Sequence, residues 1–147
     1  MIKASPFLRG ILSIQTILLI LIALSPFVLS PVCPAMPNGK FMPCHYSGLL
    51  ITVLAAFLAA LSLLITLIPV RRLILIGHAI VVLGVALCYL IPTRILPVSY
   101  APSKLFGLCG HVDMPCQHTF HLVTIGLILV AVISIGTFMW QWLRRVF

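Results

Sequence analysis

Four apolar stretches of the sequence are each long enough to cross a lipid bilayer. They run over residues 11–30, 48–70, 73–92 and 119–143. The hydrocarbon core of a bilayer is about 30 Å thick, and about 20 helical residues cross it. Because lipid offers no partner to an unpaired backbone group, spanning segments of this length must be α-helices. The sequence therefore predicts an all-α, integral membrane four-helix bundle that forms a single transmembrane domain over residues 1–147.

Charged residues are scarce, and nearly all of them are basic. The chain has nine Lys and Arg residues and one acidic residue, Asp113. This composition excludes paired-carboxylate catalysis, carboxylate sites for calcium or magnesium, and a relay of intramembrane carboxylates. No basic stretch is interleaved with aromatic residues, so we expect no nucleic-acid partner. The first apolar stretch is too long for a cleaved signal peptide, and we expect it to be retained as a helix.

The basic residues predict how the chain is oriented in the membrane. They divide six against three between the two sides: Lys3, Arg9, Arg71, Arg72, Arg144 and Arg145 against Lys40, Arg94 and Lys104. Because positive charge concentrates in cytoplasmic loops, we expect both termini to be cytoplasmic. The protein would then be a multi-pass protein of the inner (plasma) membrane, with residues 31–47 and 93–118 as outer loops.

The two outer loops resemble each other. Each has a cysteine, a short insert, Met-Pro-Cys and then a histidine, and each leads directly into a helix. The repeated residues are Cys33, Met42, Cys44 and His45 in the first loop, and Cys109, Met114, Cys116 and His118 in the second. This pattern predicts two parallel-related two-helix repeats, with a pseudo-two-fold axis along the membrane normal. Such symmetry would bring both loops together above the bundle.

The paired loops contain many soft ligands. Thiolate, thioether and imidazole groups favour copper, zinc or iron over hard cations. The candidate metal ligands are Cys44, His45, Met42, Cys116, Met114 and His118, with Met36 and His111 in the same loops. The sequence has no zinc-finger spacing and no Cys-x-x-Cys-His haem-attachment motif, so the identity of the metal stays open.

The loop cysteines have two further interpretations. They could form structural disulfides, Cys33–Cys44 with Cys109–Cys116 or a cross-loop pairing, since four cysteines allow three connectivities. They could also exchange electrons, with a thiolate activated by a neighbouring histidine. Four helices with two cysteine pairs on one face resemble DsbB and vitamin K epoxide reductase, which are quinone-linked thiol oxidoreductases. Those families carry a Cys-x-x-Cys pair, which is absent here.

Four residues inside the third apolar stretch predict how this helix packs against its neighbours. Gly77 and Gly84 lie one heptad apart, and small residues at this spacing permit close helix contact. We expect His78 to form a hydrogen bond between helices, and Cys88 to pack as a small apolar side chain.

The two loops also carry a family resemblance. Over nearly its full length the chain resembles a family of small bacterial four-helix membrane proteins classed as a domain of unknown function. The matching positions are Cys33, Met42, Cys44, His45, Cys109, Gly110, Met114, Pro115 and Cys116. Gln117 stands where the family pattern has a histidine. The resemblance implies membrane partners from an ABC transporter or an iron-uptake system.

The sequence thus favours a small inner-membrane protein with an outer Cys/Met/His site. This protein would handle a transition metal or its redox state as an accessory of a transport system. The alternatives are a DsbB-like thiol–disulfide oxidoreductase and a structural accessory subunit with two disulfides. Because four helices alone leave no roomy path across the membrane, we expect a partner protein or a homo-oligomer.

Overall fold

The computed structural model describes residues 6–29, 31–33, 39–68, 70–102, 104–109 and 114–146, without the side chains of residues 6, 71 and 144–146. Four candidate residues of the outer loops lie outside the described residues: Met36, Gly110, His111 and Asp113.

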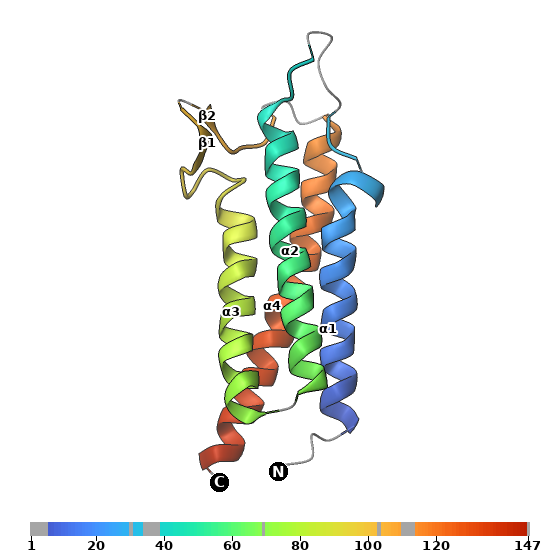
Figure 1. Cartoon of the computed structure of the whole chain (residues 1–147), viewed down its shortest axis with the longest axis vertical. Coiled ribbons are helices and arrows are strands. Elements are labelled where there is room, and N and C mark those ends of the chain that lie inside the picture. Colours follow the sequence, from blue (N-terminus) through green and yellow to red (C-terminus); the bar gives the residue numbers. More distant parts are fainter. Residues whose placement is uncertain are drawn as a thin grey trace.

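Four long helices form a bundle, as the sequence predicts. They are α1 (Pro6–Leu24), α2 (Pro43–Leu67), α3 (Arg71–Leu90) and α4 (Pro115–Val146). Each includes a segment long and apolar enough to cross a membrane. The helices run side by side, and both chain ends lie at the same end of the bundle, opposite the two long loops (Figure 1). The all-α membrane bundle is therefore confirmed, whereas the assignment of its two ends to the cytoplasm and the outside stays a prediction.

All four helices begin earlier than the apolar stretches indicate, and in α2 and α4 the added residues come from the outer loops. Helix α2 begins at Pro43 and α4 at Pro115, rather than at residues 48 and 119. Proline suits the first helical position because its fixed φ fits a helix and its missing N–H would be unpaired there anyway. The Met-Pro-Cys segments therefore belong to the first turns of α2 and α4, which places Cys44 and Cys116 on helices.

A short π-helix, η1 (Ser25–Leu29), extends α1 toward the first outer loop. Pro26 causes this change, because proline has no N–H to donate and its ring displaces the carbonyl four residues earlier. The Ser25 hydroxyl donates to the carbonyl of Ile22 at 2.9 Å, so that carbonyl is still paired inside the membrane segment. The Val32 N–H then donates to the Pro26 carbonyl at 2.9 Å and turns the chain toward Cys33.

The second outer loop contains a small hairpin that the sequence does not predict. Its strands β1 (Ser99–Ala101) and β2 (Lys104–Leu105) are antiparallel. Tyr100 of β1 stacks on Tyr46 of α2 with ring centroids 4.3 Å apart. This contact holds the hairpin beside the start of α2 (Figure 1).

The helices pack closely around an apolar core. Gly84 of α3 faces Leu58 of α2, where an added Cβ would lie 2.7 Å from the nearest leucine methyl group. At Gly77 the side chain of Ile65 lies closer still to the position of an added Cβ. Both glycines therefore permit the predicted close contact between α2 and α3. Cys88 is fully buried in the same core, which confirms that it packs as a small apolar side chain.

Polar side chains inside the bundle pair between helices. His78 of α3 is fully buried, and its Nε2 lies 3.2 Å from the hydroxyl of Thr137 in α4. The predicted interhelical role of His78 is therefore confirmed. The Thr16 hydroxyl of α1 donates to the Ser62 hydroxyl of α2 at 3.0 Å. Such bonds matter in a membrane because lipid offers no alternative partner.

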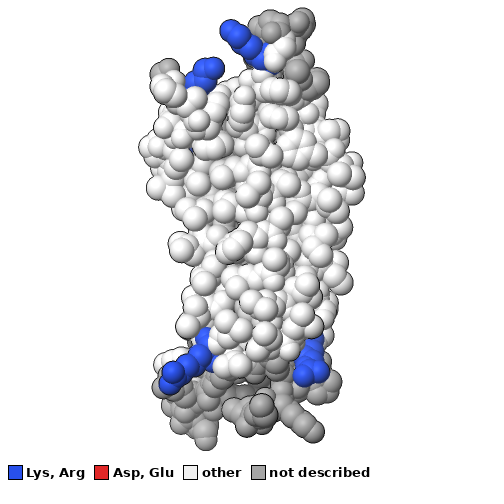
Figure 2. Space-filling model, in the orientation of Figure 1, with Lys and Arg blue, Asp and Glu red and all other residues white. Residues whose placement is uncertain are grey.

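The outer surface of the bundle suits a lipid environment. Large apolar side chains point outward along every helix, among them Ile17, Phe57, Leu83 and Val132. On the face drawn in Figure 2, Lys and Arg side chains lie near the two ends of the molecule, and none lies over the middle. An uncharged apolar band between two charged ends is the pattern of a membrane-spanning bundle.

Candidate metal centre

The structure brings four cysteines together at the loop end of the bundle. The Sγ atoms of Cys33, Cys44, Cys109 and Cys116 all lie within 4.8 Å of one another. We call these four residues the four-cysteine cluster. Cys44 and Cys116 are 1% exposed and Cys33 is 6% exposed, while Cys109 is partly exposed. Each outer loop contributes two of the four sulfurs, as the predicted repeat requires.

The repeated Met-Pro-Cys segments have the same local geometry. In the first, the His45 N–H donates to the Met42 carbonyl at 3.0 Å. In the second, the Gln117 N–H donates to the Met114 carbonyl at 2.9 Å. In both, the cysteine follows the proline that starts the helix. Two helix N-termini therefore lie beside the cluster.

Two side chains hold the segment 107–109 in place. The Gly107 N–H donates to the Ser47 hydroxyl at 2.9 Å, and that hydroxyl donates to the Gly107 carbonyl at 3.0 Å. The Gln117 side-chain amide donates to the Cys109 carbonyl at 2.7 Å. These bonds tie the segment to both α2 and α4. The backbone of Cys109 is thus fixed although this residue lies in a loop.

The thiols of the cluster influence one another. Burial alone would raise the pKa of the Cys33 thiol, but hydrogen bonds from Cys44, Cys116 and Cys109 hold this pKa below its usual value. Burial, followed by the contact with Cys44, raises the pKa of Cys109 well above its usual value. The cluster therefore loses a first proton easily and holds later protons tightly. A bound cation would replace those later protons, because metal ligation requires thiolates.

Met42 and Met114 lie beside the cluster. Both are partly buried and pack against its sulfurs. The Sδ atom of Met42 is 3.9 Å from the Sγ atom of Cys109. The structure thus places four of the six predicted metal ligands together, namely Cys44, Cys116, Met42 and Met114.

The two predicted histidine ligands lie outside the four-cysteine cluster. His45 stacks on Phe41 with ring centroids 4.1 Å apart, and the edge of its ring contacts Phe27 and Tyr46. His118 is exposed on the first turn of α4. His45 follows Cys44 directly and His118 follows Cys116 by two residues. These spacings do not bring the imidazoles to the sulfurs, because residues one or two apart on a helix point in different directions.

None of the described cysteines forms a disulfide in the structure. The Sγ atoms of Cys109 and Cys44 lie 3.2 Å apart, and those of Cys33 and Cys109 lie 3.8 Å apart. A disulfide bond is about 2.05 Å long. The predicted pairings within each loop are therefore not confirmed, and the closest pair joins the two loops.

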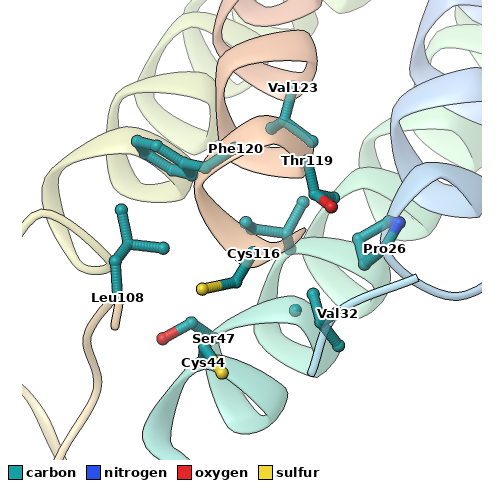
Figure 3. A pocket seen from close by; sticks show the side chains of 11 residues that line it. Pro26, Val32, Cys44, Ser47, Leu108, Cys116, Thr119, Phe120 and Val123 are labelled. Atoms are coloured by element: carbon teal, nitrogen blue, oxygen red, sulfur yellow. The ribbon is translucent and has the colours of Figure 1, made fainter. Parts of the chain in front are cut away.

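A small cavity adjoins the cluster on the side of the helix bundle. Its volume is about 10 Å³, which is room for about one water molecule. The sulfur atoms of Cys44 and Cys116 lie near the Ser47 hydroxyl beside it, while Phe120 and Val123 form an apolar wall (Figure 3). This cavity is too small to hold an organic cofactor such as a quinone.

Cys33 and Cys109 are the residues that sequence reasoning did not assign to the metal set. The sequence predicts them only as disulfide-forming or electron-exchanging cysteines, because neither of them lies in a Met-Pro-Cys segment. The repeat itself indicates that these two cysteines belong to the site. Each loop opens with a cysteine, so two loops meeting on one axis bring together four sulfurs rather than two.

Comparison with known families agrees with the resemblance drawn from the loops. The family model described as "Domain of unknown function (DUF4418)" matches residues 15–140. The chain therefore belongs to this family, and the match includes α2, α3, both loops and most of α1 and α4. Comparison with curated proteins and with solved structures gives no match.

Proposed function

We propose that this member of the family binds one soft transition-metal ion in the four-cysteine cluster, at the outer face of the plasma membrane. The mutual distance of the four sulfurs, at most 4.8 Å, carries this proposal. With metal–sulfur bonds of about 2.3 Å, the ligand sulfurs of a tetrahedral site lie about 3.8 Å apart. The separations of 3.8 Å for Cys33–Cys109 and 3.2 Å for Cys44–Cys109 differ little from that value. Small side-chain movements would complete the site.

The ligand set limits which ions the cluster would hold. Four thiolates select copper, zinc or iron over calcium, magnesium or manganese. A polynuclear iron–sulfur cluster binds its thiolates to different iron atoms, which spreads the ligand sulfurs apart. Sulfurs this close together favour a single ion.

Transport of the metal ion across the membrane would require this chain together with a partner protein. Side chains such as Leu19, Val81 and Val130 are fully buried between the helices, so the described bundle is packed along its length. The ion would therefore be held at the outer surface and passed to another protein. An ABC-transporter or iron-uptake membrane protein, or a second copy of this chain, would supply the path.

Metal analysis of the purified full chain tests this function. The protein is prepared in detergent under anaerobic, reducing conditions, loaded with Cd(II), Zn(II) or Cu(I), and desalted. We expect about one ion per chain, and loss of that ion when any one of Cys33, Cys44, Cys109 and Cys116 is replaced by serine. Cys88→Ser is the matched control, because Cys88 lies in the apolar core away from the cluster. A reduced wild-type chain that retains no metal would contradict the proposal.

The 3.2 Å contact between Cys44 and Cys109 supports a second candidate, thiol–disulfide exchange. Oxidation of this pair would join the two sulfurs and release two protons and two electrons, which a quinone would accept to become a hydroquinone. Quinone-dependent oxidation of a thioredoxin-like substrate, lost in Cys44→Ser and Cys109→Ser, would select this activity. A metal-free chain whose loop cysteines stay oxidised at glutathione potentials would instead indicate two structural disulfides.

A further inference from the structure

Two thioethers lie beside the four-cysteine cluster in equivalent places. Met42 and Met114 each precede the proline that starts a helix, and each packs against the cluster while part of its side chain stays exposed. They therefore connect buried sulfurs with the surface of the loop end. A hydrophobic plug would need only an apolar side chain at these positions, whereas both loops place a sulfur there.

The Met42 thioether is close enough to share an ion with a cysteine. Its Sδ atom lies 3.9 Å from the Sγ atom of Cys109. Two metal–sulfur bonds of about 2.3 Å span up to about 4.6 Å, so one ion could contact both atoms. Cys109 is also the partly exposed member of the cluster. An ion arriving from outside would therefore meet Met42 and Cys109 together.

Thiolates and thioethers differ in the ions they accept. Thiolates bind zinc, cadmium, iron and copper, whereas a neutral thioether is a good ligand for Cu(I) and a poor one for Zn(II). The four-cysteine cluster and the two methionines beside it together contain six sulfurs, while His45 and His118 lie outside this group. This composition is selective for the monovalent, softest ion of the set.

We propose that Met42 and Met114 are entry ligands for Cu(I), which makes the four-cysteine cluster a copper(I) acceptor. The proposal rests on the metal-binding function above and names its ion. The ion would exchange a Met42 thioether for the Cys109 thiolate, and each thiol that binds it would release one proton. Copper stays monovalent throughout, so the exchange needs no oxidant or reductant.

A comparison of two metals tests the role of the thioethers. The full chain in detergent, reduced and anaerobic, receives Cu(I) from a chromophoric chelator, and the rate and extent of transfer are followed by absorbance. In parallel, Cd(II) binding is followed by its thiolate absorption band. The test variant is Met42→Leu with Met114→Leu, since leucine keeps the volume and apolar character of methionine. Met139→Leu, at an exposed position of α4, is the matched control.

We expect the double variant to accept Cu(I) at least about 10-fold more slowly or more weakly, the scale of an altered metal shell. Its Cd(II) binding and helical circular dichroism should match those of wild type and of the control. Unchanged Cu(I) transfer in the double variant would overturn the entry role. Equal loss of Cu(I) and Cd(II) would also overturn it, because the methionines would then only support the fold. A wild-type chain that binds Cd(II) but not Cu(I) would overturn this inference alone, and one that binds neither would overturn the proposed function as well.

Discussion

Ser47 of α2 and Gly107 of the second outer loop are joined by two hydrogen bonds, of 2.9 and 3.0 Å, although they are 60 residues apart. Both residues are buried. Ser47 lies one helical turn after Cys44, and Gly107 lies two residues before Cys109. These two hydrogen bonds therefore position Cys109 beside Cys44, and they link the two halves of the repeat.

Replacing Ser47 by alanine should remove both of these hydrogen bonds and weaken metal binding. The change leaves the buried N–H and carbonyl of Gly107 without their partner, which costs about 1–3 kcal/mol. Cys109 would lose its fixed position, and Cd(II) affinity should fall about 10- to 100-fold, as for other groups that orient metal ligands. Competition with a metal chelator measures the affinity. Thr124→Ala removes a hydroxyl that bonds only within its own helix, and it should leave Cd(II) binding unchanged. Equal Cd(II) affinity in wild type and Ser47→Ala would show that Cys109 needs no such support.

Gln117 should act through the Cys109 carbonyl. Gln117→Leu removes the donor that lies 2.7 Å from this oxygen, and we expect Cd(II) affinity to fall by about 10-fold. Gln117→His introduces an imidazole, which also carries an N–H donor, and it should retain most of the affinity. The same chelator competition compares the two variants. If Gln117→Leu binds as tightly as Gln117→His, the hydrogen bond has no influence on the site.

Metal affinity should rise with pH. Binding requires thiolates, and the raised pKa of Cys109 means that the metal must displace its proton near neutral pH. The lowered pKa of Cys33 means that its proton is lost more readily. Acid therefore opposes binding, and Cd(II) affinity should increase steadily from about pH 6 to about pH 9.

The dependence on pH has an internal control. Protons released on Cd(II) binding can be counted with an indicator dye in weakly buffered solution. Cys88→Ser should release as many protons as wild type and show the same dependence on pH, because Cys88 lies in the apolar core and is not one of the four clustered cysteines. An affinity that does not change with pH would show that the thiols are not the ligands.

Gly84→Ala should destabilise the packing of α2 on α3. The new methyl group would lie 2.7 Å from Cδ1 and 3.2 Å from Cγ of Leu58, so the whole leucine side chain would have to move. Overpacking of this kind costs about 1–3 kcal/mol. Gly136→Ala is the matched control, because no atom lies within 4 Å of its added Cβ. Thermal unfolding in detergent compares the two variants. A melting temperature as high in Gly84→Ala as in Gly136→Ala would contradict the close contact.

Gln15→Leu should stabilise the bundle. Gln15 is fully buried, and neither polar atom of its amide has a hydrogen-bond partner among the described residues. Removing an unpaired buried amide at nearly equal volume should gain about 1–3 kcal/mol. Thr16→Val is the contrasting variant, since it breaks the bond to Ser62 and should destabilise. Thermal unfolding in detergent measures both, and a lower melting temperature for Gln15→Leu would show that the amide is paired.

The membrane fold could be predicted from the sequence because its cause is local. A bilayer requires about 20 apolar helical residues per crossing, and four such stretches are visible without any knowledge of how they pack. The helix starts were placed too late because hydropathy marks the apolar segment, whereas Pro43 and Pro115 mark the first helical residue. The hairpin at 99–105 was missed because strands of three and two residues leave no pattern.

The candidate site depended on tertiary structure in a different way. The repeat predicted that the two loops would meet, and it supplied the sulfur-rich chemistry, with carboxylates almost absent from the chain. It could not tell which side chains would turn inward. Cys109 joins Cys44 because Ser47 and Gln117 fix the loop from two helices, while His45 turns away to stack on Phe41.

The sequence by itself therefore determined that the chain lies in a membrane and which functional groups are available for chemistry. Hydropathy and residue type are local properties that can be seen without knowing the fold. Only the tertiary structure decided that four cysteine thiols and two methionine thioethers form one group, and that the histidines lie outside it. Ligand geometry is set by contacts between distant residues, such as Ser47 and Gly107, which are 60 positions apart. Local patterns along the chain do not reveal which of these contacts will form.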